Sequence, residues 1–213
     1  FLLGALYAPL LTAAWLGAFL GIGDVPSVGT PLRLWHGHEM LFGFSAAIIA
    51  GIVLTALPSW AGTPEICGGR LAVLLLLWLA GRIAFWAAPW LPPPAPAVAD
   101  LAFFPALLVM VAPQLARARN RLYLLLLPIL LALAAANAAY HYGILAANTA
   151  VAGLGLRAGL YSVILLYVLK GGVLTPVFSG NALRARGRGD QAPFNIELEM
   201  LAVGVVLLLA ALD

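Results

Sequence analysis

Long apolar segments recur along the whole chain, and they restrict its fold more than any other feature of the sequence. A helix of about 20 such residues crosses a hydrocarbon core about 30 Å thick. Hydrophobic residues make up 64% of the 213 residues and charged residues only 9%, against roughly 25% charged in soluble domains. No strand-like alternation competes with the apolar runs, so helices would satisfy the backbone. We therefore predict an all-α, polytopic transmembrane helical bundle in the lipid bilayer.

Prolines, glycines and charges divide the apolar sequence into about seven spans. The predicted spans are 1–21, 36–58, 70–91, 98–116, 121–145, 155–178 and 194–212. We expect residues 1–213 to form a single transmembrane helical domain. Because the chain begins at Phe1 without a methionine and ends at the close of an apolar run, we expect a fragment of a longer chain.

The arginines of the loops give an orientation. Loops on one side of the predicted spans hold seven of them: Arg70, Arg117, Arg119, Arg121, Arg184, Arg186 and Arg188. The opposite loops hold Arg33 and Arg157. By the positive-inside rule the N-terminus is cytoplasmic, and the basic residues are topology signals, with no nucleic-acid partner. All three histidines, His36, His38 and His141, then lie near the outer ends of their spans.

The segment LWHGHEMLFGF (34–44) places two of the three histidines and a carboxylate within four positions. Imidazole binds haem iron, copper and zinc and titrates near neutral pH, so metal ligation and proton relay both remain open. At 100° per residue His36 shares a helix face with Glu39, whereas His38 points nearly opposite. The two histidines cannot bind one metal from a regular helix. Either the helix begins at about residue 38, or each histidine serves a different site.

Two further polar residues, Asn137 and Arg82, are candidates for the same site. Asn137 lies one turn before His141, where it could orient the imidazole. The flanking Tyr140 and Tyr142 fit an aromatic belt at the membrane interface. Arg82 lies too deep in its span to snorkel, so it needs an anion, and Glu39, Asp100 or haem propionates could supply one; a protein carboxylate is the simpler partner.

Three segments resemble the NnrS family of membrane proteins. The segment HGHEMLFGFSAAIIAGIVLTALPSW (36–60) strongly resembles its first motif, and NAAYHYG (137–143) is similar to its second histidine segment. The segment GGVLTPVFSGN (171–181) resembles a third motif, with Val173 where the family has arginine. The resemblance implies about twelve spans in the whole protein, of which this chain would be the N-terminal half. It also implies haem and copper as cofactors, and a link to nitric oxide stress in denitrifying bacteria.

The residues and the resemblance together favour a haem-binding integral membrane protein of nitric oxide metabolism or protection, with haem b as cofactor and copper as a second option. We expect cofactor contacts from His36, His38, His141 and Arg82, metal ligation by the three histidines, and supporting contacts from Glu39 and Asn137. Expected partners are haem, nitric oxide, and a second copy or the remaining half of the chain, in the bacterial inner membrane.

The alternative is a proton-coupled small-molecule transporter. In it His36, Glu39, Arg82 and His141 would form a polar relay instead of a ligand set. Whether the protein turns over a substrate is left open by the sequence.

Overall fold

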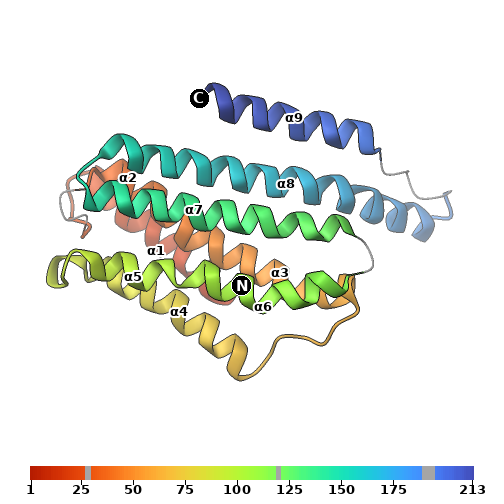
Figure 1. The fold of residues 1–213 in the computed structure, drawn as a ribbon, viewed down its shortest axis with the longest axis horizontal. Coiled ribbons are helices and arrows are strands. Elements are labelled where there is room, and N and C mark those ends of the chain that lie inside the picture. The colour runs from red at the N-terminus through yellow and green to blue at the C-terminus, as the bar shows by residue number, and fades with distance from the viewer. Residues whose placement is uncertain (27–29, 119–120, 189–194) are drawn as a thin grey trace. The chain divides into compact units, whose positions relative to one another are not determined.

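The computed structural model describes residues 1–26, 30–118, 121–188 and 195–213, and helices without strands make up this part of the chain (Figure 1). The all-α prediction is confirmed. Arg119 and residue 194, where the seventh span was predicted to begin, lie outside the described residues, as does the side chain of Val173.

The helices follow one another with short connections. Nine are α-helical within the described ranges: α1 (Leu2–Phe19), α2 (Leu32–His38), α3 (Ala46–Ala61), α4 (Gly69–Trp86), α5 (Pro94–Leu101), α6 (Phe103–Arg117), α7 (Leu126–Leu145), α8 (Thr149–Ala185) and α9 (Ile196–Leu212). The π-helical segment η1 (Glu39–Ser45) joins α2 to α3, and the short 3-10 helices η2 (Ala88–Trp90) and η3 (Arg121–Leu125) precede α5 and α7.

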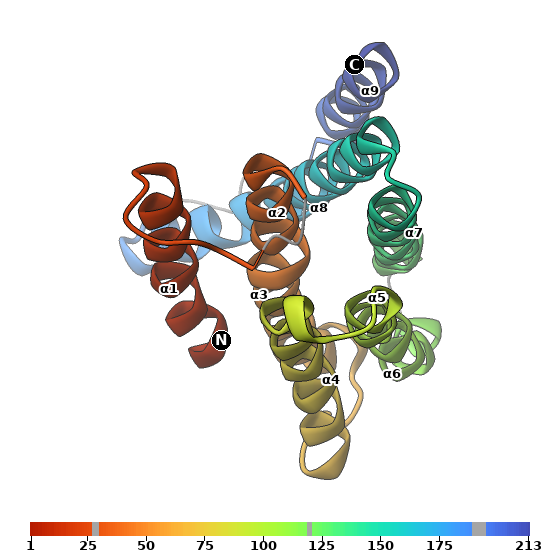
Figure 2. The ribbon, with the colours of Figure 1, turned by 90° about the vertical axis from the view of Figure 1, so that its left-hand side faces the viewer.

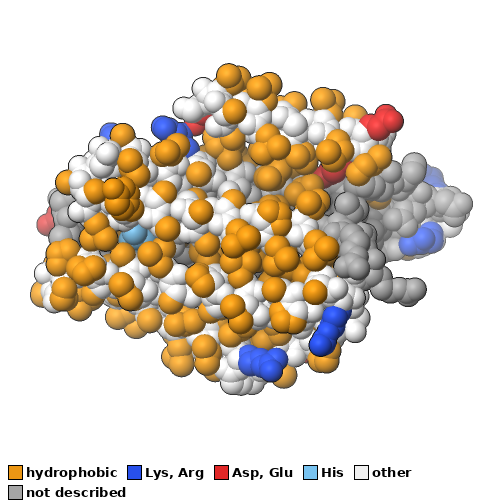
Figure 3. Space-filling view, viewed as in Figure 1, with side chains coloured by type: hydrophobic (Ala, Val, Ile, Leu, Met, Phe, Trp, Pro, Cys, Tyr) orange, Lys and Arg blue, Asp and Glu red, His pale blue; other side chains and the backbone are white. Residues whose placement is uncertain are grey.

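Six helical segments of the described chain are long and apolar enough to cross a membrane. They are Leu2–Phe19, Leu32–Ser59, Gly69–Trp86, Pro94–Arg117, Tyr123–Leu145 and Thr149–Ala185. They correspond to the first six predicted spans. The seventh prediction corresponds to α9, whose 17 residues are fewer than the about 20 that cross the hydrocarbon core. Hydrophobic side chains cover most of the face seen in Figure 3, as expected of a surface in contact with lipid.

The described chain forms two compact units, residues 1–159 and 160–213. In the first unit α4 packs against α5, α3 against α6, and α6 against α7, while α1 contacts α2 and η1; Figure 2 shows these helices nearly end-on. The second unit holds the remainder of α8 and the helix α9, which Asn195 caps by accepting from the backbone N–H groups of Glu197 and Leu198. A single transmembrane domain over 1–213 stays a prediction.

The second span begins earlier than its apolar run indicates. The helix begins at Leu32, four residues before the predicted start, so His36 belongs to the helix and not to a preceding loop. Of the two alternatives for the histidine pair, the structure therefore supports separate environments for His36 and His38.

Candidate metal centre

A buried polar cluster forms inside the first unit, where three separate spans meet around α2 and η1. Its main residues are His38 at the end of α2, Glu39 at the start of η1, Arg82 in α4, Asp100 in α5, and Asn137 and His141 in α7. Each of these side chains is at most 5% exposed. Helix packing in the first unit thus gathers six polar groups in an apolar surrounding.

Neighbouring side chains contact both nitrogens and both faces of the His38 ring. Its Nδ1 lies 3.2 Å from Oε1 of Glu39, and its Nε2 lies 3.0 Å from Oδ1 of Asn137. The two faces of the ring stack on Phe85 and Tyr140, with centroid distances of 4.4 and 4.3 Å. Both the position and the rotation of this imidazole are therefore fixed by contacts.

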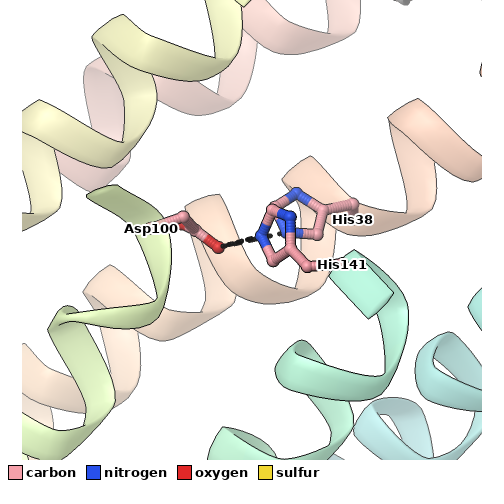
Figure 4. Close-up of side chains that lie close together, drawn as sticks. All are labelled: His38, Asp100 and His141. Carbon is pink, nitrogen blue, oxygen red and sulfur yellow. Dashed lines mark hydrogen bonds and ion pairs between the residues drawn. The ribbon is translucent and has the colours of Figure 1, made fainter. Parts of the chain in front are cut away.

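His38 and His141 converge on the carboxylate of Asp100 (Figure 4). Oδ2 of Asp100 lies 3.2 Å from Nε2 of His38 and 2.9 Å from Nε2 of His141. Each of the three residues offers one atom that could bind a metal ion, and these three atoms lie within 4.8 Å of one another. Two ligands bound to one ion at about 2.1 Å and roughly at right angles lie about 3 Å apart. The two carboxylate–imidazole separations thus match neighbouring ligands of a single metal ion.

Arg82 bridges the two carboxylates of the cluster. Its Nη1 donates to Oε1 of Glu39 at 2.5 Å, and its Nη2 forms an ion pair with Oδ1 of Asp100. The prediction that Arg82 pairs with protein carboxylates is confirmed. With both carboxylates ionised and the guanidinium protonated, these three buried groups leave one uncompensated negative charge. Because an unpaired buried charge is costly, the cluster favours one additional positive charge near the imidazoles, either a proton on His38, both of whose nitrogens face acceptor oxygens, or a metal ion.

The π-helical segment η1 lets Arg82 approach the backbone. A Cβ atom at Gly43 would lie only 2.6 Å from Nη1 of Arg82, so any larger residue here would force the guanidinium to move away from its carboxylate partners. The carbonyl of Gly43 accepts a hydrogen bond from Nε1 of Trp78 at 2.9 Å. Single π turns of this kind occur frequently at functional sites, and here the turn places Glu39 in the cluster of His38.

A second layer of aromatic donors fixes Glu39. The hydroxyl of Tyr7, in α1, donates to Oε2 of Glu39 and accepts from Nε1 of Trp86 at 2.9 Å. Glu39 is fully buried, and its oxygens accept from Tyr7 and from Arg82. Its orientation toward Nδ1 of His38 is therefore set by residues of α1 and α4.

His36 lies outside this cluster. Its ring stacks on Trp15 of α1 with a centroid distance of 4.6 Å, and its Nδ1 is buried without a hydrogen-bond partner among the described residues. The structure thus brings together His38, His141 and Arg82 of the predicted contact residues and places His36 apart. Ligand roles for all four stay predictions.

The supporting residues differ in part from expectation. Glu39 contacts its sequence neighbour His38, whereas the ring of His36 stacks on Trp15. Asn137 contacts His38 and donates to Oδ2 of Asp100 at 2.7 Å, whereas we expected it to orient His141. The interface assignment of Tyr140 is wrong, since this residue is 1% exposed and stacks on His38; Tyr142 is 67% exposed.

Two members of the network were not among the predicted site residues. Asp100 was considered only as a partner of Arg82, although an acidic residue within an apolar span is a functional candidate by default. The sequence does not single out Tyr7 in the same way, because tyrosines in apolar helices are common at membrane interfaces. Only the packing of α1 against η1 shows that its hydroxyl reaches Glu39.

A haem does not fit between His38 and His141. The carboxylate of Asp100 lies between their Nε2 atoms, and Phe85 and Tyr140 cover both faces of His38. A planar macrocycle with one histidine on each side would displace the carboxylate of Asp100 from the two Nε2 atoms. The same donor atoms suit a bare ion, because two imidazoles and one carboxylate are a known ligand set for first-row transition metals.

Fold and site together define a polytopic helical membrane protein with a buried histidine–carboxylate cluster. The chain belongs to the NnrS family: the family description, NnrS protein, matches residues 1–213. Membership links this membrane protein to nitric oxide responses. No curated protein and no solved structure matches the chain.

Proposed function

We propose that this chain is a transition-metal-binding membrane protein of nitric oxide metabolism or protection, and that His38, Asp100 and His141 hold the ion. The observation that supports this most is the convergence of two imidazole Nε2 atoms on one carboxylate oxygen, at 3.2 and 2.9 Å. Those three ligands leave coordination positions open, the arrangement of non-haem iron(II) sites, and imidazole also suits copper. We therefore expect iron(II) or copper.

The surrounding residues would prepare the ligands for this role. With Glu39 accepting from Nδ1–H of His38, a metal ion at Nε2 would replace the contact of that nitrogen with Oδ1 of Asn137. Such a carboxylate contact also raises the basicity of the imidazole. Arg82 binds the oxygen of Asp100 opposite to the one that faces the imidazoles. Asn137 donates to Oδ2 of Asp100 and so orients the ligand oxygen.

A metal ion with open positions would supply a site where nitric oxide binds directly. The protein would contribute a dry site, since all three proposed ligands are at most 4% exposed. Nitric oxide is small and uncharged, so it reaches a buried site through lipid.

Haem b stays a prediction for this protein, and its position between His38 and His141 is not part of the proposal. His36 is the remaining candidate for haem ligation, because its Nδ1 is buried without a hydrogen-bond partner among the described residues. An optical spectrum of the purified protein tests it: a Soret band that is lost in His36→Ala would support haem ligation at this residue.

The transporter alternative uses part of the same network. Glu39, Arg82 and His141 are connected through Asp100, which is the observation that favours a relay. The imidazole of His36, the fourth proposed relay member, stacks on Trp15 and makes no hydrogen bond to this network among the described residues. A relay would work without metal, so metal content separates the two functions.

The experiment measures metal in protein purified in detergent from cells supplied with iron and copper. We expect about one ion per chain by inductively coupled plasma mass spectrometry, and its loss in Asp100→Asn, His38→Gln and His141→Gln. The matched control is His36→Gln, a histidine on the same helix outside the cluster, which should keep the metal. Size-exclusion chromatography and circular dichroism confirm folding of each variant. A metal-free, folded protein would refute the proposal and favour the relay.

A further inference from the structure

The first unit contains a cavity of about 350 Å³ that runs from the surface toward the polar cluster. It lies where α2 begins and α7 ends, next to η2 and the start of α5. Its rim includes Leu91 and Leu145, which are 36% and 50% exposed, whereas its inner wall includes Ala97 and Tyr140, which are 5% and 1% exposed. The cavity, here called the vestibule, therefore connects exposed helix ends with the buried interior of the unit.

The inner wall of the vestibule is shared with the candidate metal centre. His141, whose Nε2 lies 2.9 Å from Oδ2 of Asp100, lines the vestibule. Phe85 and Tyr140, the two rings that stack on His38, line it as well. One layer of side chains therefore separates the vestibule from the cluster. Because side chains in a packed interior still change rotamers, a small molecule can cross this layer without unfolding of the helices.

The wall of the vestibule discriminates between neutral and charged molecules. Among the described residues that line it there is no lysine, arginine, aspartate or glutamate. An ion that left water for this wall would meet no opposite charge, so its entry is strongly disfavoured. A small neutral molecule has no charge to desolvate, and the volume suffices for several molecules of the size of water, which occupies about 30 Å³ in the liquid.

We propose that the vestibule admits small uncharged molecules to the cluster of His38, Asp100 and His141 and excludes anions. Its consequence for the metal ion rests on the proposed function: the ligand that reaches the ion is nitric oxide itself, and not an anionic nitrogen oxide such as nitrite. Nitric oxide that arrives through lipid still has to cross the helix packing around the ion. The vestibule shortens this last step to one layer of side chains.

The first test measures access to the inner wall without any metal. Cys67 is exposed and is the single cysteine of the chain, so Cys67→Ser gives a background in which Ala97→Cys supplies the only thiol. The purified full chain, in dodecyl maltoside with EDTA, reacts either with neutral propyl methanethiosulfonate or with the sulfonatoethyl reagent, an anion of similar length. Intact mass gives each rate. Relative to the same two rates at Cys67, we expect the anion to be slower by about a hundredfold or more at residue 97.

Two further variants show that the reagent arrives through the vestibule. Ala88→Phe adds an aromatic ring to the wall, and in the Ala97→Cys background it should slow the neutral reagent by about tenfold. Ala136→Cys places the thiol at a position that is equally buried, 3% exposed, and lies outside the wall. This thiol should react with neither reagent in the folded chain.

The second test measures the route to the ion. Iron(II)-loaded protein is mixed with nitric oxide without oxygen, and the absorbance of the nitrosyl complex gives the association rate. Ala88→Phe and Ile144→Phe, both in the wall, should lower this rate by about tenfold or more at unchanged iron content. Ala138→Phe adds the same ring at an exposed position of α7 outside the wall and should leave the rate unchanged. Circular dichroism confirms that each variant is folded.

The outcomes separate this proposal from the metal proposal. An Ala97→Cys variant that neither reagent modifies, or that both modify with the same relative rates as Cys67, would overturn the vestibule. An unchanged association rate of nitric oxide in both wall variants would also overturn it and would leave the metal centre intact. A folded chain that never holds metal would refute the metal centre, and the cysteine reactions alone would then support or overturn the vestibule.

Discussion

Replacement of Arg82 by methionine should destabilise the protein more than any other single change in the cluster. The guanidinium is 4% exposed and lies 2.5 Å from Oε1 of Glu39, besides its ion pair with Asp100. At an effective dielectric constant of 20, one such contact is worth about 7 kcal/mol before desolvation. Because the change leaves two buried carboxylates unpaired, we expect a net loss of about 3–5 kcal/mol.

The assay is thermal unfolding in detergent, followed by circular dichroism. At about 2–4 °C per kcal/mol for a chain of this size, the Tm should fall by about 6–20 °C. Arg117→Met, an exposed arginine at the end of α6, is the matched control and should change the unfolding free energy by less than about 0.5 kcal/mol. Adding Glu39→Gln and Asp100→Asn to Arg82→Met should recover most of the loss. A Tm within 2 °C of wild type for Arg82→Met, or no recovery in the triple variant, would refute this account.

Two further substitutions test the surroundings of the cluster. Gly43→Ala should lower the unfolding free energy by about 1–3 kcal/mol, because its Cβ would lie 2.6 Å from Nη1 of Arg82. The control Gly153→Ala, whose Cβ meets nothing within 4 Å, should raise the unfolding free energy by about 0.5–1 kcal/mol. Chemical denaturation measures both, and the same change in unfolding free energy for the two variants would contradict the close approach at Gly43. Tyr7→Phe should cost about 1–3 kcal/mol, since Nε1 of Trp86 loses its acceptor. The same variant should also weaken the metal binding measured above, whereas an unchanged metal content would show that the contact with Tyr7 does not position the ligands.

The spans could be predicted from sequence because the membrane imposes a simple physical requirement. Every backbone polar group must be satisfied within its own segment, so apolar runs of sufficient length become helices. The same reasoning predicted the partner class of Arg82, since a buried guanidinium needs an anion, and the structure supplies Glu39 and Asp100. It also placed His38 and His141 near the same end of their spans, and their ring centroids lie 5.0 Å apart.

The composition of the cluster could not be predicted in the same way. Assignment of residues to helix faces assumed a regular α-helix, and the π turn of η1 invalidates that assumption from Glu39 onward. Burial of Tyr140 depends on close packing of α7 against α8 at Gly155, where a Cβ would lie 2.6 Å from the backbone nitrogen of Tyr140. Contacts of this kind arise from tertiary packing, and no local pattern in the sequence specifies them.

Stability does not explain why the chain keeps this cluster. Apolar residues of similar volume in place of a buried ionic group are often neutral or stabilising, and an apolar core would suit a membrane bundle. The network instead fixes one imidazole through polar contacts at both nitrogens and stacked rings, and its two carboxylates and one guanidinium leave a negative charge beside two converging nitrogens. A bound metal ion accounts for both features, because it needs oriented ligand atoms and it neutralises the charge; a proton on His38 neutralises the charge as well, and metal content separates the two. Simultaneous replacement of Glu39, Arg82 and Asp100 by methionine or leucine should therefore preserve the fold while abolishing metal binding.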